Sequence, residues 1–520
     1  MRGAPSPPNR GRRCAGPAPD IQLVRGARGG SPEGDAGPLH TRLYRALRAH
    51  ILEGELRPGA RIPSARALAA DLRLSRNTVE TAIAQLVAEG FVERRVGSGT
   101  IVARSLSEAA PFRPGARKAV EARSGAGRSG ATEALSARAR LILEIGRPAA
   151  RVDPLIGAGV SDAGFFPWQQ WTRLTARFAR RAGRRSMRPA SPAGLPELRE
   201  QIAAYVNLSR GLRVTAEQVV IVSSTQQAVD LCARVLLDPG DLAFVEEPGY
   251  PSARAAFALS GARVRPVPVD AEGALIADLP TRLRRPHALY LTPSQQFPLG
   301  GTMSLARRLQ ALAWAADTRG FLIEDDCDRE FWYDGRPLAA LHGLDRHERV
   351  IYLGTFNKAL FPGLRLAYLI VPPRLAEAFA AARRLADGFS PVLPQIVLAD
   401  FMAGGHFAGC LRQARAHYRS CRDALVRAVS EHWGPGVVLG PATAGLHVAA
   451  RMAHSVDDLA VAAACAPLSR ALGVSALSAH ATLKHPDRGL LLNFGAADPA
   501  GVRESIRAMA PVVRGAAGAR

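Results

Sequence analysis

Two stretches without apolar periodicity divide this 520-residue chain and limit what it can fold into. Residues 1–37 consist largely of Arg, Gly, Pro and Ser, and residues 105–149 largely of Ala, Arg, Gly and Ser. Such segments bury too little apolar surface to offset their conformational entropy, so we expect a disordered tail and a flexible linker. Regular apolar patterns occupy most of the rest, at 38–104 and 150–512. The sequence therefore predicts a multidomain protein with two separate folded parts.

The first patterned segment, 38–104, has the signals of three helices followed by a hairpin. Ser64 and Ser75 stand where N-caps are expected, before the second and third helices. Two short strands, 91–96 and 100–102, flank the glycine-rich tip 97–99. The buried face of the first helix recurs every four positions, at Leu43, Leu47 and Ile51. This order of elements predicts a winged helix-turn-helix.

Side chains at the start of the third helix suit the reading of DNA. In a helix-turn-helix, the first turn of this helix meets base edges in the major groove. Arg76 can pair with guanine and Asn77 with adenine, and Thr78 is expected to be exposed beside them. Phosphate contacts are expected from basic residues of the second helix and the hairpin, namely Arg66, Arg94 and Arg95. A winged helix that contacts protein instead of DNA is the alternative.

Three strings in this segment closely resemble GntR-type bacterial transcription regulators: IPSARALA at 62–69, LSRNTV at 74–79 and EGFVERRVGSGT at 89–100. The resemblance spans 38–103 and implies binding to a double-stranded DNA operator. By position it implies contacts from two helices and the wing tip, at Arg66, Ser75, Arg76, Asn77, Thr78, Gly97 and Gly99. Glu80 stands where some relatives carry a basic residue.

The second patterned segment alternates apolar strands with helical stretches, which predicts an α/β domain with a mostly parallel sheet. The clearest strands are expected at 219–222, 288–291, 321–323 and 350–353. No apolar run reaches the roughly 18–20 residues of a membrane-spanning helix, so we exclude a membrane protein. Six scattered cysteines without a CxxC pair indicate a reducing cytoplasm and no metal site of the zinc type.

The basic residues of the chain are almost all arginines. The net charge of +23 agrees with binding to a polyanion, but a general enrichment in arginine explains it equally well. Only three of the 68 basic residues are lysines, namely Lys118, Lys358 and Lys484. Arginine replaces a lysine that supplies only charge, but it cannot form a Schiff base at neutral pH. A lysine in an apolar setting is therefore a candidate for covalent chemistry.

Polar residues follow three of the predicted strands. Lys358 follows the strand at 350–353, where its amine can attack an aldehyde or serve as a buried structural lysine. Acidic residues at 324–328 can hold a protonated pyridine nitrogen, or instead form a solvated loop or a magnesium site. The hydroxyl residues at 223–225 open a helix and can seat a phosphate, or act as an ordinary N-cap.

With supporting strings at 194–199, 246–251, 292–298 and 444–447, these features resemble the fold type I aminotransferases, which use pyridoxal phosphate (PLP). Over 150–510 they resemble more specifically the MocR branch of the GntR family. The resemblance implies a homodimer, a Schiff base (lysine aldimine) between PLP and Lys358, and a contact of Asp325 with the pyridine nitrogen. It puts Tyr250 near the ring. It implies phosphate contacts at Ser224, Thr225, Thr355 and Arg365.

The chain departs from the family pattern at several positions. Cys327 stands where the family usually has a tyrosine that hydrogen-bonds the ring hydroxyl, and a thiol is a weaker donor. Gln295 and Leu299 replace a usual histidine and threonine, and Asn357 replaces a usual serine. An arginine that binds the substrate carboxylate is not evident, and Arg488 is the nearest candidate.

Three functions are open at this point. The first is a cytoplasmic transcription regulator that senses PLP, or its adduct with an amine or amino acid effector. The second is an active PLP-dependent aminotransferase with an accessory DNA-binding head. The third is a regulator whose large domain only dimerises, without PLP. The altered polar residues around the ring favour the first.

Overall fold

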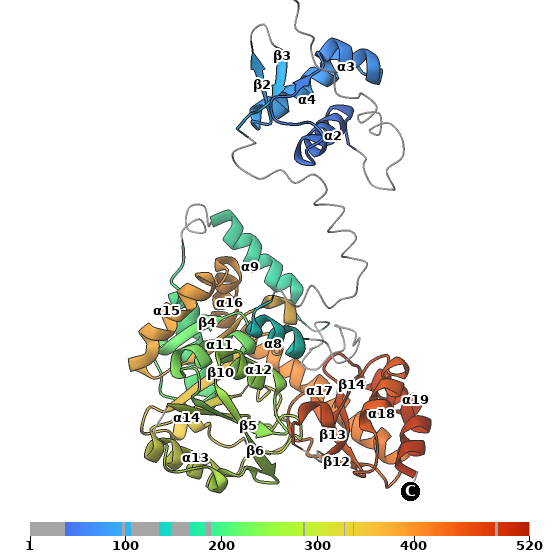
Figure 1. The fold of residues 1–520 in the computed structure, drawn as a ribbon. Coiled ribbons are helices and arrows are strands. Elements are labelled where there is room, and N and C mark those ends of the chain that lie inside the picture. The colour runs from blue at the N-terminus through green and yellow to red at the C-terminus, as the bar shows by residue number, and fades with distance from the viewer. Residues whose placement is uncertain are drawn as a thin grey trace, which may run out of the picture. The chain divides into compact units, whose positions relative to one another are not determined.

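The computed structural model describes residues 37–95, 99–105, 135–146, 164, 166–181, 189–283, 286–326, 328–335, 337–483 and 487–518. They belong to two compact units, Met1–Ser136 and Ala137–Arg520, and each is considered by itself (Figure 1). Nearly all of the expected tail and most of the expected linker lie outside the described residues, as do Gly97 and Cys327. Among the described helices, none has the length and apolar character needed to cross a bilayer.

The first unit is the predicted winged helix-turn-helix. Its apolar stripes pack into one core, which includes the three residues predicted for the first helix. The short strand β1 was not predicted from the sequence, and it extends the hairpin by pairing with β3. The elements are α2 (Leu39–Leu52), β1 (Arg61–Ile62), α3 (Ala65–Leu72), α4 (Arg76–Ala88), β2 (Val92–Arg95) and β3 (Gly99–Val102).

The second unit is built on an eight-stranded, mostly parallel sheet, which confirms the predicted fold class. The strand order is β4-β11-β10-β9-β8-β5-β6-β7, and β7 and β11 are the antiparallel members. The strands are β4 (Val219–Val222), β5 (Leu242–Glu247), β6 (Arg263–Asp270), β7 (Gly273–Ala274), β8 (His287–Leu291), β9 (Phe321–Asp325), β10 (Val350–Thr355) and β11 (Ala367–Ile370).

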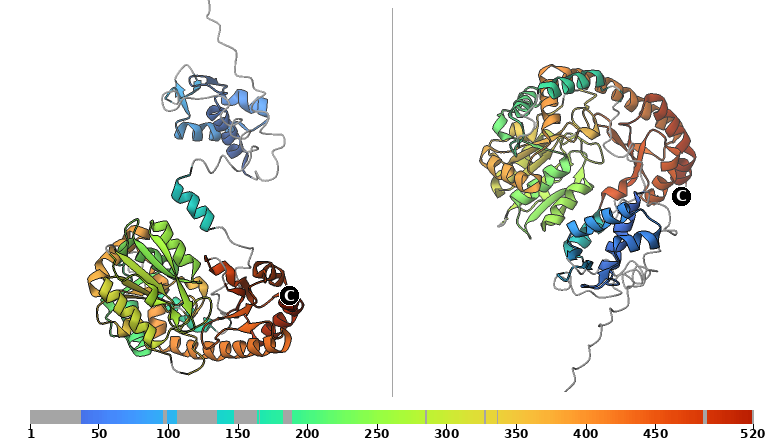
Figure 2. Two further views of the ribbon diagram at one scale, coloured as in Figure 1. Left: turned by 60° about the horizontal axis from the view of Figure 1, so that its bottom comes forward. Right: turned by 90° about the horizontal axis from the view of Figure 1, so that it is seen from above.

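Helices cover both faces of this sheet (Figure 2). Strand β4 shows why its sequence is apolar throughout: Val219 and Ile221 enter one cluster, while Val220 and Val222 enter another on the opposite face. The covering helices are α9 (Trp168–Arg181), α10 (Pro196–Arg210), α11 (Thr225–Leu236), α12 (Pro251–Ser260), α13 (Leu305–Thr318), α14 (Leu341–Leu344), α15 (Ala376–Asp387) and α16 (Val392–Ala403).

A long helix, α17 (His406–His432), joins this layer to a smaller one at the C-terminal end of the chain (Figure 2). There, a four-stranded antiparallel sheet of order β12-β13-β15-β14 packs with α17, α18 and α19 around a core of its own. Its elements are β12 (Val438–Leu439), β13 (His447–Met452), α18 (Asp458–Cys465), β14 (Gly473–Ala476), β15 (Arg488–Asn493) and α19 (Pro499–Gly518).

One helix falls within the range expected as linker. Helix α8 (Ala137–Ile145) has no buried side chain and runs beside α12. Helix α19 continues past the expected domain end at residue 512. The second unit therefore includes described structure on both sides of the expected 150–512 range.

Candidate functional site

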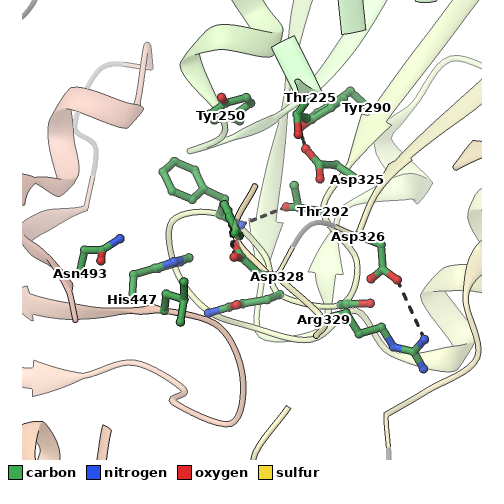
Figure 3. A pocket seen from close by; sticks show the side chains of 15 residues that line it. Thr225, Tyr250, Tyr290, Thr292, Asp325, Asp326, Asp328, Arg329, His447 and Asn493 are labelled. Atoms are coloured by element: carbon green, nitrogen blue, oxygen red, sulfur yellow. Dashed lines mark hydrogen bonds and ion pairs between the residues drawn. The ribbon is translucent and has the colours of Figure 1, made fainter. Parts of the chain in front are cut away.

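A pocket lies where the parallel strands of the large sheet end. Ligands of α/β sheets bind at this edge because loops from several strands converge there. The lining comes from the loops that follow β4, β5, β8, β9 and β10, and from β13 and β15 of the small sheet (Figure 3). The topology thus brings together the polar residues that the sequence places after separate strands.

Lys358 enters this pocket from the turn after β10. Its Nζ donates to both carboxylate oxygens of Asp328, at 2.8 and 2.9 Å. Burial raises the pKa of Asp328, but the positive charge of Lys358 and its hydrogen bond to the carboxylate oppose burial, and that pKa lies below its ordinary value. The lysine amine is therefore held in one position by an ionised carboxylate.

Asp325 ends strand β9, beside β10 in the sheet, and also faces the pocket. The hydroxyl of Tyr290 donates to it at 2.5 Å, and Thr225 lies next to both (Figure 3). Thr225 is the first residue of α11, so backbone N–H groups of a helix start are close at hand. A primary amine, a carboxylate and a helix N-terminus in one pocket fit the aldehyde, the pyridine nitrogen and the phosphate of PLP.

The loop after β8 is fixed by a buried acid of the neighbouring strand. Glu246 of β5 accepts hydrogen bonds from the Thr292 backbone N–H at 3.1 Å and hydroxyl at 2.5 Å. Burial raises the pKa of Glu246 to about 7, although the Thr292 bonds oppose that shift. These contacts set the position of the pocket wall formed by Thr292 to Phe297.

The cofactor residues predicted from the sequence divide into two groups. Those that line the pocket are Thr225, Tyr250, Asp325 and Lys358. Ser224 instead caps α11 by accepting from the Gln227 amide at 3.2 Å, and Thr355 accepts from the Asn357 amide at 3.1 Å. Arg365 is exposed, in the left-handed backbone region with φ of 55°.

Asn357, a departure from the family pattern, connects two loops beside the pocket. Its Nδ2 donates to the Ser223 carbonyl at 3.1 Å, and its Oδ1 accepts from the Leu366 amide at 3.0 Å. An amide side chain reaches both partners at once, which a serine hydroxyl on a shorter side chain does not. The residue therefore ties the helix-start loop to the turn that carries Lys358.

The acidic residues after β9 point to different partners, which argues against the magnesium alternative. Asp325 accepts from a tyrosine of β8, Asp326 pairs with Arg210 at 3.2 Å, and Asp328 pairs with Lys358. A magnesium site needs several oxygen ligands that converge on one point. In the part of the chain that the structure describes, no cluster of three or more metal-ligand side chains is found.

Sequence reasoning assigned no role in ligand binding to the far wall of the pocket, which includes three uncharged polar residues. His447 and Asn493 are directly paired on the adjacent strands β13 and β15, and Gln295 lines the pocket from the loop after β8. Burial lowers the pKa of His447 to about 4. The candidate Arg488 does not line the pocket, because it pairs with Asp458 at 3.0 Å at the other end of β15.

In the winged helix-turn-helix, the predicted DNA contacts at the start of α4 share one exposed turn. Ser75 caps the helix by accepting from the Thr78 amide at 3.0 Å, and the two hydroxyls are 2.8 Å apart. Arg76 and Asn77 follow the cap with exposed side chains, whereas Thr78, which was expected to be exposed, is half-buried. Arg66 is also exposed, on α3.

The wing carries an ion pair that the sequence did not reveal. Arg94 of β2 donates to Glu80 of α4 at 2.7 Å. Helix α4 therefore binds the side chain of Arg94, which was predicted to contact phosphate. Arg95 is exposed and donates to Glu93 at 3.0 Å. At the start of β3, next to the wing tip, Gly99 has φ of +78°, and a Cβ there would lie 3.3 Å from Nη2 of Arg61.

Comparison with known proteins finds both units in one family. Residues 39–102 match the bacterial regulatory proteins of the gntR family, and residues 156–479 match aminotransferase class I and II. The probable rhizopine catabolism regulatory protein MocR of Rhizobium meliloti is 36% identical over 475 residues, 91% of this chain and 93% of that protein. The HTH-type transcriptional regulator TauR of Rhodobacter capsulatus is 36% identical over 404 residues, 77% of this chain and 81% of that protein.

Solved structures resemble the second unit. An archaeal alanine:glyoxylate aminotransferase has a TM-score of 0.67 and 25% identity, and covers 74% of this chain and 99% of its own. LysN, the α-aminoadipate aminotransferase of Thermus thermophilus, has a TM-score of 0.64 and 27% identity. The match covers 75% of this chain and 98% of LysN. Its structure contains N-(5'-phosphopyridoxyl)-L-leucine, and the family match supports PLP as the cofactor of this domain. The chain belongs to the MocR-type branch of the GntR family of bacterial transcription regulators, in which a winged helix-turn-helix precedes an aminotransferase class I and II domain.

Proposed function

We propose that this regulator binds operator DNA through residues 38–104 and holds PLP at Lys358, where an amine effector changes its DNA binding. The observation that carries the proposal is the position of Lys358, with its amine fixed by Asp328 in the same pocket as Asp325. Bound PLP supplies an aldehyde carbon that joins reversibly to amines. The effector is thus expected to be an amine that competes with Lys358.

Each pocket residue has a proposed role that its contacts support. Asp325 holds a proton at the pyridine nitrogen, and the hydroxyl of Tyr290 orients its carboxylate. Thr225 and the start of α11 bind the phosphate, and Tyr250 covers the ring. Asp328 keeps the Lys358 amine in place by accepting hydrogen bonds from it.

The protein is proposed to be a cytoplasmic homodimer, in which two winged helix-turn-helix units bind DNA together. Two heads on a homodimer match operator half-sites related by a two-fold axis. An effector that changes the large domain then alters how the heads meet those half-sites, as a shift between two arrangements.

The test is the absorption spectrum of the purified full-length protein. We expect an absorption band from Lys358-bound PLP that shifts with amines, together with amine-dependent operator affinity. A protein without the band contradicts the proposal and supports the purely structural role. The aminotransferase alternative, which the class I and II family match supports, predicts sustained release of a keto acid from an amino donor.

Arg76→Ala is expected to weaken operator binding by about 1–3 kcal/mol, because Arg76 is exposed on the first turn of α4 and can read a base bidentately. Fluorescence anisotropy on operator and on random DNA checks this prediction. An equal loss on both DNAs would assign Arg76 to phosphate contact.

Glu80→Ala is expected to strengthen binding to DNA of any sequence. The change removes an acid from the recognition helix and releases Arg94 from its ion pair. One more phosphate contact raises the salt dependence of log K by a slope of about one. Salt titrations of both proteins on random DNA measure that slope, and an unchanged slope would show that Arg94 stays away from the backbone.

A further inference from the structure

We propose that the effector site selects a primary amine whose body carries hydroxyl groups instead of a carboxylate. The inference rests on the proposed function, because it concerns the part of the same pocket that lies beyond the cofactor residues. It names His447, Asn493 and Gln295 as the residues that recognise the body of the effector.

The recognising groups are buried, uncharged and short of partners. His447 and Asn493 are each 4% exposed, and both project into the pocket from the small sheet (Figure 3). Within the described residues, His447 Nε2 and Gln295 Oε1 make no hydrogen bond. A buried polar atom without a partner costs free energy that a ligand hydrogen bond recovers. This wall therefore calls for a ligand that supplies polar groups.

The orientation of these side chains is fixed before a ligand arrives. Gln295 Nε2 donates to the Ala444 carbonyl at 2.8 Å. This bond orients the side-chain amide so that Oε1 points away from that carbonyl. Asn493 Oδ1 accepts from the Gly495 amide at 2.9 Å, so its NH2 group is the part left for a ligand. The wall offers donors and acceptors side by side, and a hydroxyl group is both.

The charges of the pocket disfavour a carboxylate. The charged lining residues are three aspartates, Lys358 and Arg329. Lys358 is paired with Asp328. The Arg329 guanidinium lies on the side of the pocket away from His447, 4.0 Å from Asp326, and within the described residues its Nε and Nη1 make no hydrogen bond (Figure 3). Burial keeps His447 neutral at pH 7, since it lowers the pKa to about 4. A carboxylate next to His447 and Asn493 would thus have only the paired Lys358 as a nearby cation among the described lining residues, and Asp328 would repel it.

The test compares two amines that differ in one group. The PLP-loaded full-length protein is titrated with 2-amino-1,3-propanediol and with L-serine, in which a carboxylate replaces one hydroxymethyl group. The shift of the cofactor absorption gives each Kd. We expect the diol to bind at least about tenfold more tightly. Equal or tighter binding of serine, or no response to either amine, overturns the inference.

Variants of the far wall separate recognition from folding. His447→Leu is expected to weaken diol binding by about fivefold or more, while His454→Leu, an exposed change just beyond the other end of β13, leaves it unchanged. Asn493→Arg adds a cation and is expected to reverse the preference in favour of serine. Retention of the diol preference by both pocket variants overturns the inference. Absence of any cofactor band in the unmodified protein contradicts the proposed function itself, which is a distinct result.

Discussion

We expect Lys358→Ala to abolish retention of PLP through gel filtration and every spectral response to amines. The amine of Lys358 is fixed in the pocket, whereas Lys118 and Lys484 lie outside the described residues, in the expected linker and in a polar stretch of the sequence. DNA binding should survive, since the winged helix-turn-helix has its own core. Absorption spectra and fluorescence anisotropy with DNA measure the two effects on one preparation.

Lys358→Arg is the matched control. It keeps a cation beside the buried Asp328 carboxylate, but a guanidinium does not form a Schiff base at neutral pH. We therefore expect this variant to fold as well as the unmodified protein and still lose the cofactor band. Borohydride reduction and peptide mapping identify the attachment point directly. Label on a peptide that contains Lys118 or Lys484 would refute the assignment.

The strands of the large sheet could be predicted because both of their faces are buried. Residues 219–222 are apolar at each position, and the structure gives β4 the same bounds. Strands β9 and β10 continue further than their apolar runs, to Asp325 and Thr355, because the polar residues at their ends still pair in the sheet. The apolar pattern therefore located the strands correctly. It did not predict the last residues at their carboxyl ends, where the pocket lies.

Half of the pocket could be predicted, for a related reason. Lys358, Asp325 and Thr225 each follow a strand of a parallel sheet, and parallel strands bring such residues to one edge. His447 and Asn493 belong to a separate antiparallel sheet, and their pairing depends on a register between strands 46 positions apart in the chain. Spacing along a sequence does not contain that register.

Ion pairs between distant segments were equally hidden. The sequence predicts a phosphate contact for Arg94 and no partner for Glu80, yet the fold of the wing onto α4 brings the two side chains to 2.7 Å. The expected linker also contains more order than its composition indicates. Helix α8 forms at 137–145 although none of its side chains is buried.

Arg210→Met is expected to lower the free energy of unfolding of the large unit by about 3–5 kcal/mol. Arg210, at the end of α10, is 4% exposed in its side chain and pairs with Asp326 at 3.2 Å and Glu330 at 2.7 Å. Methionine fills similar space but leaves both carboxylates buried without their cation. Asp326 directly follows Asp325, so the same change is expected to loosen PLP retention.

Urea denaturation followed by tryptophan fluorescence measures the Arg210→Met loss, because all five tryptophans of the chain lie beyond residue 137 and report on the large unit alone. Arg213→Met, an exposed change three residues later, is the control and should stay within about 0.5 kcal/mol. Adding Glu330→Gln to Arg210→Met removes one of the stranded charges and should recover part of the loss. A loss below about 1 kcal/mol for Arg210→Met, with no recovery in the double variant, would show that water or the neighbouring cations Arg329 and Arg415 compensate the two acids.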